Sequence, residues 1–165
     1  MKKIAVMGHI DHGKTTLISA IGNVFNTEVK TVPDTLRTEA KVNFGGEDYL
    51  FFDYPNDYGY LMNLDCTEDG AVLVIAGTDG AMDGTEEAMN ICKNFGIDII
   101  AVFFSKCDLV EYEEFLEMVE MDIKYCLECR GMDDKIPFIC GSANMNYSGW
   151  KSEIKKLVEA VAKSL

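Results

Sequence analysis

The sequence predicts an α/β fold in which helices cover both faces of a mostly parallel β-sheet. Apolar, β-branched runs of strand length alternate with helical patterns through almost the whole chain, which is typical of such a sheet. The first apolar run, Lys3–Met7, leads directly into a glycine-rich loop and then into a helix-forming stretch. The length of 165 residues predicts one domain, spanning residues 1–165.

The apolar runs predict six strands, and the helical patterns predict five helices. Glycines 45 and 46 separate the second and third strands and predict a hairpin, so the second strand is expected to run antiparallel. The predicted strands are Lys3–Met7, Glu39–Phe44, Tyr49–Asp53, Ala71–Ala76, Ile97–Phe104 and Pro137–Cys140. The helices are expected to follow Gly13, Asn56, Asp83, Val110 and Ser148.

Apolar stripes at helical spacing predict which helix faces enter the core. The same interpretation assigns the nine methionines to the core. In the fourth helix the stripe is Phe115, Met118, Val119, Asp122, Ile123 and Cys126. In the last helix it is Trp150, Ile154, Leu157, Val158, Val161 and Leu165.

One long stretch, Asn26–Thr38, shows no clear periodicity. Irregular segments of this length inside a compact domain tend to be functional or mobile. It follows the first helix directly.

Composition excludes several classes of function. The formal charge is −13, from 15 basic and 28 acidic residues, which argues against a sequence-independent grip on DNA or RNA. No apolar segment reaches membrane-spanning length or resembles a secretory signal, so we expect a cytoplasmic protein with no membrane partner. The six cysteines are then expected to be reduced thiols. Cys126 and Cys129 have zinc-ligand spacing, but no second such pair exists.

The glycine-rich loop, Gly8–Thr15, fills every fixed place of the pattern G-x-x-x-x-G-K-[ST] and predicts a three-layer P-loop NTPase fold. Gly8 and Gly13 let the backbone turn so that N–H groups point inward at phosphate oxygens. Lys14 is expected to reach the β- and γ-phosphates, and Thr15 to give its hydroxyl to Mg²⁺. The expected nucleotide contacts here are Gly8, His9, Asp11, His12, Gly13, Lys14, Thr15 and Thr16.

Two later segments indicate that the base is guanine. Ser105-Lys106-Cys107-Asp108 fits the pattern [N/T/S]-K-x-D, in which the carboxylate of Asp108 accepts from the guanine ring N–H and exocyclic amine together. The aliphatic stem of Lys106 would lie over the base. Ser142 and Ala143 follow the sixth strand and offer a backbone N–H to the guanine carbonyl.

These segments together resemble the GTP-binding domain of elongation factor Tu and related translational GTPases. The residues that carry the resemblance are Gly8–Leu17, Thr78–Met82 and Ser105–Ile123. The resemblance implies a six-stranded sheet, bound Mg²⁺, and cycling between GTP and GDP states that a protein partner recognises.

The chain departs from these relatives at the end of the third strand. They carry Asp-x-Pro-Gly-His where this chain has Asp53-Tyr54-Pro55-Asn56-Asp57. Asp53 still fits a Mg²⁺ ligand acting through a water. Asn56 replaces the glycine whose N–H contacts the γ-phosphate. Asp57 replaces the histidine that positions the attacking water, and the γ-phosphate would repel its negative charge. The candidate catalytic residues are Asp57, in place of that histidine, and Lys14.

The first switch also lacks the motif of the relatives. Its Mg²⁺-binding threonine is expected to be replaced by Thr35 or by Thr38. Arg37 is interpreted as a solvated loop charge, with a cation near the γ-phosphate as the alternative.

Two functions remain open. The first is slow, Mg²⁺-dependent GTP hydrolysis, and the second is a pseudo-GTPase that holds GDP or GTP and docks a protein partner without turnover. Full elongation-factor activity with ribosome and tRNA is not expected, because the sequence carries no β-barrel domains after the fifth helix.

Overall fold

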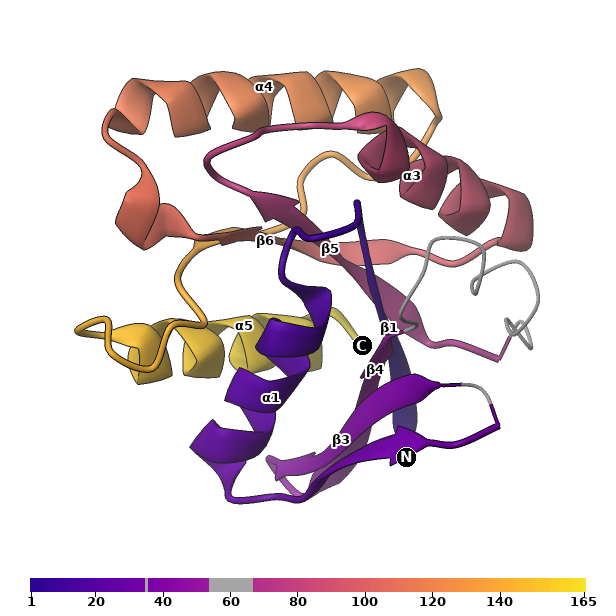
Figure 1. Cartoon of the computed structure of the whole chain (residues 1–165). Coiled ribbons are helices and arrows are strands. Elements are labelled where there is room, and N and C mark those ends of the chain that lie inside the picture. Colours follow the sequence, from indigo (N-terminus) through magenta and orange to yellow (C-terminus); the bar gives the residue numbers. More distant parts are fainter. Residues whose placement is uncertain (35, 54–66) are drawn as a thin grey trace.

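The computed structural model is a three-layer α/β/α domain built on one seven-stranded sheet (Figure 1). It describes residues 1–34, 36–53 and 67–165. The strands are β1 (Lys2–Met7), β2 (Val29–Val32), β3 (Arg37–Phe44), β4 (Glu47–Asp53), β5 (Gly70–Ala76), β6 (Ile99–Ser105) and β7 (Phe138–Cys140). The helices are α1 (Lys14–Phe25), α3 (Asp83–Phe95), α4 (Glu113–Cys129), α5 (Trp150–Ser164) and the short 3-10 turn η1 (Cys107–Leu109).

The strands lie in the order β2-β3-β4-β1-β5-β6-β7. β3 pairs antiparallel with both of its neighbours, whereas β4, β1, β5, β6 and β7 pair in parallel. Gly45 and Gly46 have φ angles of +62° and +89° and form the tight turn between β3 and β4, which confirms the predicted hairpin. The predicted mostly parallel sheet with an antiparallel second strand is therefore confirmed, with one additional strand.

That additional strand, β2, lies inside the stretch predicted to be irregular. Its four residues pair with the first half of β3, as Val29 with Ala40 and Val32 with Arg37. A strand of this length is too short to show a periodic pattern, and Lys30 and Thr31 at its centre are exposed. Pairing with the longer β3 therefore makes it a strand, and the prediction of a loop over Asn26–Thr38 is wrong there.

Two apolar clusters lie on opposite faces of the sheet. α1 and α5 cover one face, where Leu17, Ile21 and Leu157 are fully buried. α3 and α4 cover the other, around Leu73, Met89 and other core residues. All residues of β5 and β6 are buried, as expected for central strands with helices on both sides.

The helix predictions are confirmed in number and place for α1, α3, α4 and α5, while the helix predicted after Asn56 lies outside the described residues. The stripe of α5 is buried from Trp150 to Val161, as predicted. The stripe of α4 is confirmed in part, because Val119 and Ile123 are buried as predicted. Leu127, which the predicted stripe did not include, is buried as well, whereas Met118 is 60% exposed.

The assignment of the methionines to the core is also wrong for part of the set. Met7 and Met89 are fully buried, whereas Met82, Met121 and Met145 are exposed. A flexible, unbranched side chain fits both settings, so residue type alone does not separate them. In the described part of the chain, no helix is long and apolar enough to cross a membrane.

Candidate nucleotide-binding site

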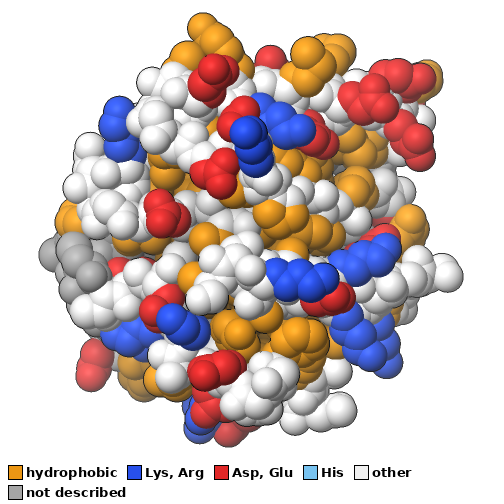
Figure 2. Space-filling view, turned by 180° about the vertical axis from the view of Figure 1, so that it is seen from behind, with side chains coloured by type: hydrophobic (Ala, Val, Ile, Leu, Met, Phe, Trp, Pro, Cys, Tyr) orange, Lys and Arg blue, Asp and Glu red, His pale blue; other side chains and the backbone are white. Residues whose placement is uncertain are grey.

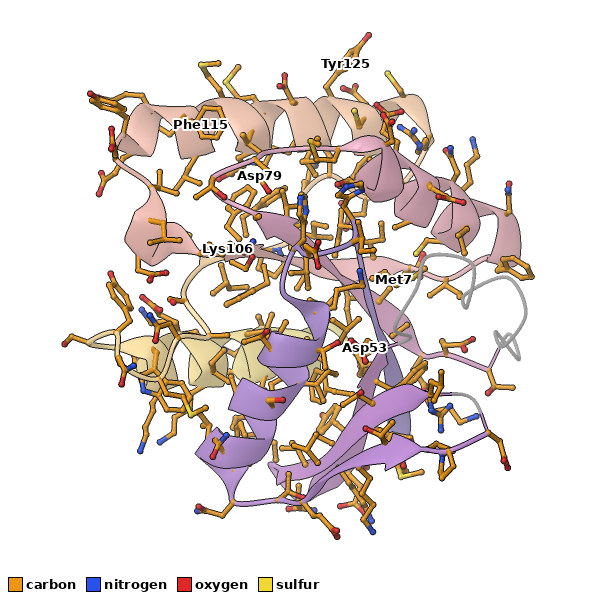
Figure 3. The ribbon with its side chains drawn as sticks, in the orientation of Figure 1. Met7, Asp53, Asp79, Lys106, Phe115 and Tyr125 are labelled. Atoms are coloured by element: carbon orange, nitrogen blue, oxygen red, sulfur yellow. A yellow bond between two sulfur atoms is a disulfide. The ribbon has the colours of Figure 1, made fainter. Side chains whose placement is uncertain are left out.

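The predicted site residues lie together at the carboxyl edge of the sheet. The glycine-rich loop follows β1, Asp53 ends β4, Lys106 follows β6, and Ser142 follows β7. Figure 3 shows Asp53, Asp79 and Lys106 arranged around the start of α1. Loops at this edge, where neighbouring strands lead to opposite faces, form the usual ligand crevice of open α/β sheets.

The backbone of the phosphate loop adopts conformations that favour glycine at both fixed positions. Gly8 has a φ of +143°, and an added Cβ would overlap the carbonyl oxygen of Val74 in β5. Gly13 has a φ of +93° and caps the first turn of α1, whose N-terminus therefore points into the loop. Asp11, between them, has a φ of +60°. The loop thus has the fold expected of a phosphate cradle.

Lys14 lies over this loop. Its Nζ donates to the carbonyl oxygens of Gly8 and His9 at 2.8 and 2.7 Å, and the residue is 8% exposed. These bonds hold a positive charge at the mouth of the loop, beside a cavity of about 260 Å³. The cavity is lined by Ile10, Asp11, Gly13, Lys14, Thr15, Thr16 and Lys106.

Thr15 and Asp53 form a pair of oxygen ligands beside the loop. The Thr15 hydroxyl donates to Oδ2 of Asp53 at 2.6 Å. Asp53 is 1% exposed, and its Oδ1 has no hydrogen-bond partner among the described residues. Burial raises the pKa of the Asp53 carboxyl, while the Thr15 hydroxyl and the charge of Lys14 act in the opposite direction. A buried carboxylate with an unpartnered oxygen beside a hydroxyl fits a small, hard cation such as Mg²⁺.

His12 is buried within the loop and is neutral at pH 7. Burial, followed by the neighbouring His9, lowers the pKa of His12 to about 4, although Asp79 acts in the opposite direction at 3.5 Å. His9 packs edge-on against His12 at 5.0 Å between ring centroids, and its Nδ1 accepts from the N–H of Gly84 at the start of α3. His9 therefore joins the loop to α3, whereas neither ring nitrogen of His12 has a hydrogen-bond partner among the described residues.

A second cavity of about 260 Å³ adjoins the loop, and all predicted guanine-contacting residues line it. Its wall consists of Gly13, Thr16, Ser105, Lys106, Asp108, Leu109, Ser142, Ala143 and Asn144. Ser105 donates through Oγ to the carbonyl oxygen of His12 at 2.5 Å, and Lys106 donates to that of Asp11 at 2.8 Å. Through these two bonds the base cavity and the phosphate loop form one continuous site.

A family model described as the elongation factor Tu GTP binding domain matches residues 56–165, well over half of the chain. The chain belongs to this family. The matched segment contains the Ser105–Asp108 and Ser142–Ala143 loops, whereas the phosphate loop precedes it. Membership in the elongation factor Tu GTP-binding family indicates guanine-nucleotide binding. The motif and the geometry of the phosphate loop independently support nucleotide binding.

Asn144 and Leu109 line the base cavity but were not predicted. Asn144 donates from its side-chain amide to Oδ2 of Asp108 at 3.4 Å, and its backbone N–H donates to Oγ of Ser142 at 3.1 Å. It thus joins the segment after β6 to the segment after β7. The sequence signal for Asn144 was its position directly after Ser142-Ala143. Leu109 lines the cavity because it lies in the turn η1, and no sequence pattern predicted that turn.

The predicted switch residues are only partly described. Thr35, Asn56 and Asp57 lie outside the described residues, as does the remainder of the Asp53–Asp57 motif after its first position. Thr38 pairs with Asp53 across β3 and β4. Arg37 is the first residue of β3 and not a loop charge, since it pairs with Glu39 at 2.8 Å and lies over the ring of Phe52 at 4.8 Å.

The prediction of six reduced thiols is wrong for two cysteines. Cys107 and Cys140 form a disulfide, with Cα atoms 6.3 Å apart. They follow and end the adjacent parallel strands β6 and β7, and the sequence alone does not show that these strands are neighbours. Cys92, Cys126 and Cys129 are free, and no group of three or more His, Cys, Asp or Glu side chains that could hold a metal ion occurs in the described ranges.

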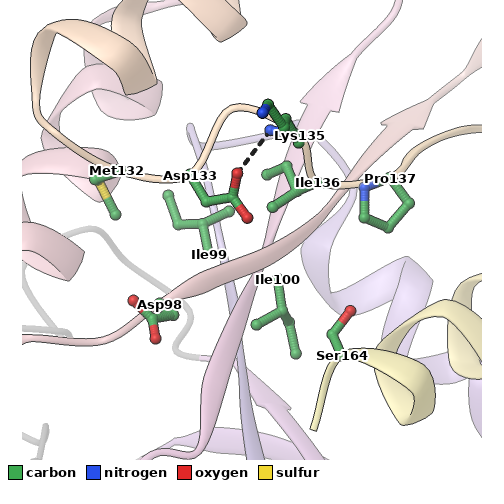
Figure 4. A pocket seen from close by; sticks show the side chains of 9 residues that line it. All are labelled: Asp98, Ile99, Ile100, Met132, Asp133, Lys135, Ile136, Pro137 and Ser164. Carbon is green, nitrogen blue, oxygen red and sulfur yellow. Dashed lines mark hydrogen bonds between the residues drawn. The ribbon is translucent and has the colours of Figure 1, made fainter.

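Another cavity lies away from this site. A cavity of about 340 Å³ lies at the amino ends of β6 and β7, between Asp98, Met132, Pro137 and Ser164 (Figure 4). It lies at the edge of the sheet opposite to the phosphate loop. On the face drawn in Figure 2, basic side chains are interspersed with acidic ones, in keeping with the net charge of −13.

Proposed function

We propose that this chain binds GTP and GDP with Mg²⁺ and hydrolyses GTP slowly, as a cytoplasmic nucleotide-binding domain. The observation that carries the proposal is the base cavity, which Lys106, Asp108 and Ala143 line. The bond from Lys106 to the carbonyl oxygen of Asp11 joins this cavity to the phosphate loop. A phosphate loop alone does not distinguish GTP from ATP. A carboxylate beside it that accepts from two adjacent donors favours guanine, because adenine offers no such pair.

The binding roles follow from the chemistry of each group. The N–H groups of the loop and the N-terminus of α1 would bind the phosphate oxygens, and Lys14 would neutralise the β- and γ-phosphates. Asp108 would accept from guanine, the stem of Lys106 would cover the base, and the N–H of Ala143 would donate to the guanine carbonyl. The side-chain amide of Asn144 would orient the carboxylate of Asp108.

Thr15 and Asp53 are the residues that would hold Mg²⁺. The unpartnered oxygen of Asp53, buried beside the Thr15 hydroxyl, supports this assignment. When bound, the ion neutralises charge on the phosphate oxygens. Thr15→Ala should weaken nucleotide binding in Mg²⁺ but leave it unchanged in EDTA. An equal loss in both conditions would contradict the assignment, and isothermal titration with GDP makes the comparison.

Slow turnover is proposed because the residues that sense the γ-phosphate are changed. Asn56 restricts the backbone where relatives have glycine, and Asp57 places a negative charge where they position water with histidine. We expect hydrolysis no faster than that of an unassisted small GTPase, on the order of 10⁻⁴ s⁻¹. Asp57 also favours the second candidate, a pseudo-GTPase that binds nucleotide and docks a partner at its switch segments without turnover.

A single-turnover assay with radiolabelled GTP separates the two candidates. Measured rates on the order of 10⁻⁴ s⁻¹ that depend on Mg²⁺ support the slow GTPase, while intact GTP after many hours supports the binding module. Asn56→Gly combined with Asp57→His should raise the rate by more than the product of the single effects, since phosphate and water must be positioned together. A parent rate above about 10⁻² s⁻¹ would contradict the loss of switch function and implicate Arg37 as a cation acting in cis.

A further inference from the structure

The disulfide joins the two loops that line the base cavity. Cys107 lies between Lys106 and Asp108, both of which line that cavity. Cys140, 33 residues later, ends β7 and directly precedes the loop that carries Ser142. The bond therefore fixes the distance between the carboxylate expected to accept from guanine and the backbone expected to donate to it.

Besides the disulfide, the pairing of β6 with β7 and several hydrogen bonds join these segments, and the N–H of Gly141 donates to the carbonyl oxygen of Phe104 at 2.9 Å. The backbone N–H of Cys107 donates to the carbonyl oxygen of Gly141 at 3.1 Å, and the amide of Asn144 reaches Asp108 at 3.4 Å. The net stabilisation from such hydrogen bonds is small, because their groups can bond to water instead. Reduction of the disulfide would therefore allow the two loops beyond the paired strands to move more freely relative to each other.

The pair is accessible to small reagents. Cys140 is exposed, and Cys107 is half-buried directly behind it. Cys92, in contrast, is fully buried, and burial raises the pKa of its thiol to about 12, so that it carries almost no thiolate at neutral pH. Exchange with a small disulfide is therefore expected to begin at Cys140.

We propose that Cys107 and Cys140 form a reversible thiol–disulfide pair that sets the affinity of the base cavity, with the oxidised form binding guanine nucleotides more tightly. This inference rests on the proposed guanine-nucleotide binding. The oxidant is a low-molecular-weight disulfide of the glutathione type. The Cys140 thiolate attacks one of its sulfurs and releases a first thiol, and the Cys107 thiolate then attacks the Cys140 sulfur and releases a second. Two protein thiols become one disulfide, and one small disulfide becomes two thiols.

The oxidised form is expected to bind guanine nucleotides more tightly because its base cavity is preorganised. The oxidised structure already holds Asp108 and Ala143 at one cavity, so binding need not order the two loops. In a reducing compartment, disulfides are usually transient and redox-sensing, which suits a pair at a ligand site. Linkage then requires the reciprocal effect, in which bound nucleotide favours the disulfide by the same factor.

The test measures GDP affinity by isothermal titration after equilibration in reduced or oxidised glutathione. We expect a Kd about fivefold larger for the reduced protein, and a shift of about 20 mV in the midpoint potential of the pair when GDP is saturating. Peptide mapping by mass spectrometry after alkylation assigns the bond to Cys107 and Cys140. Cys140→Ser should bind GDP like the reduced parent in both buffers, and Cys107→Ser should do the same.

Cys129→Ser is the matched control, because Cys129 is an exposed free cysteine on α4, outside the base cavity. It should keep the full difference between the two buffers. Equal GDP affinities of the oxidised and reduced parent would overturn the redox inference and leave the proposed function standing. The same holds for failure of the disulfide to form in oxidised glutathione. Absence of GDP binding in both buffers would overturn both proposals.

Discussion

Asp108→Asn should remove the preference for guanine without unfolding the domain. The carboxylate of Asp108 lines the base cavity, and Asn144 donates to its Oδ2 across 3.4 Å, so both oxygens can still accept from a base. Asparagine would keep one acceptor and present a donor to the second guanine donor. A charge-assisted hydrogen bond is worth 1.5–3 kcal/mol, and partial exposure places Asp108 in the lower part of that range. We expect the Kd for GDP to rise roughly 10- to 30-fold.

Calorimetric titration with GDP, IDP and ADP measures this effect. IDP lacks the exocyclic amine of guanine, so the parent should bind it more weakly than GDP, and the variant should bind both nearly alike. Glu111→Gln is the matched control, since it neutralises an exposed carboxylate three residues away that does not line the cavity. A variant that still prefers GDP over IDP and ADP by the parental factor would refute the assignment of Asp108.

Three further predictions concern the phosphate loop. Lys14→Ala should weaken GTP binding more than tenfold by titration, because it removes the ammonium held over the loop, and parental affinity would show that the loop binds no phosphate. Gly8→Ala should lower the free energy of unfolding in urea more than Gly45→Ala does. Both glycines have positive φ, but only at Gly8 would a Cβ overlap a carbonyl, so equal losses would contradict a steric cause. His12→Gln should flatten the pH dependence of stability. The folded pKa of about 4 lies below the ordinary 6.5, so the parent loses on the order of 3 kcal/mol as pH falls between these values, and identical profiles would refute the buried, neutral state.

Local patterns predicted most of the fold and of the site, because the central elements are long and bounded by glycine turns. The segments with Asp108 and Ser142 follow two predicted parallel strands. Parallel strands bring their carboxyl ends to one edge, so the sequence predicts that these two residues lie at the same edge. β2 was missed because its pairing with β3, and not its four residues, makes it a strand. The disulfide was missed for the same kind of reason, since the spacing of Cys107 and Cys140 carries no information until β6 and β7 are adjacent.

The stripe of α4 failed in part for a different physical reason. The predicted stripe joined Val119 and Ile123 to Met118, but the buried line continues from Val119 and Ile123 to Leu127. Apolar side chains at helical spacing on both sides of this line leave the edges of the buried face undetermined. β-branched and leucine side chains were selected for the core, and Met118 remained at the surface. Periodicity predicts that a helix forms, whereas the contacts with β6 and α3 decide which of these apolar side chains are buried.

The location of the sequence departures suggests why affinity and turnover need not change together. The groups expected to hold the base and the β-phosphate lie at the start of α1 and in the segments that follow β1, β6 and β7. Hydrogen bonds from Ser105 to His12 and from Lys106 to Asp11 join these segments. The changed residues, Asn56 and Asp57, follow β4 and belong to neither base loop. On the proposed function, substitutions there would alter the placement of water and γ-phosphate while the base cavity keeps its lining. A domain of this kind can therefore retain tight, guanine-specific binding after its hydrolysis rate has fallen, and restoring Gly and His at these two positions should change the rate far more than the GDP affinity.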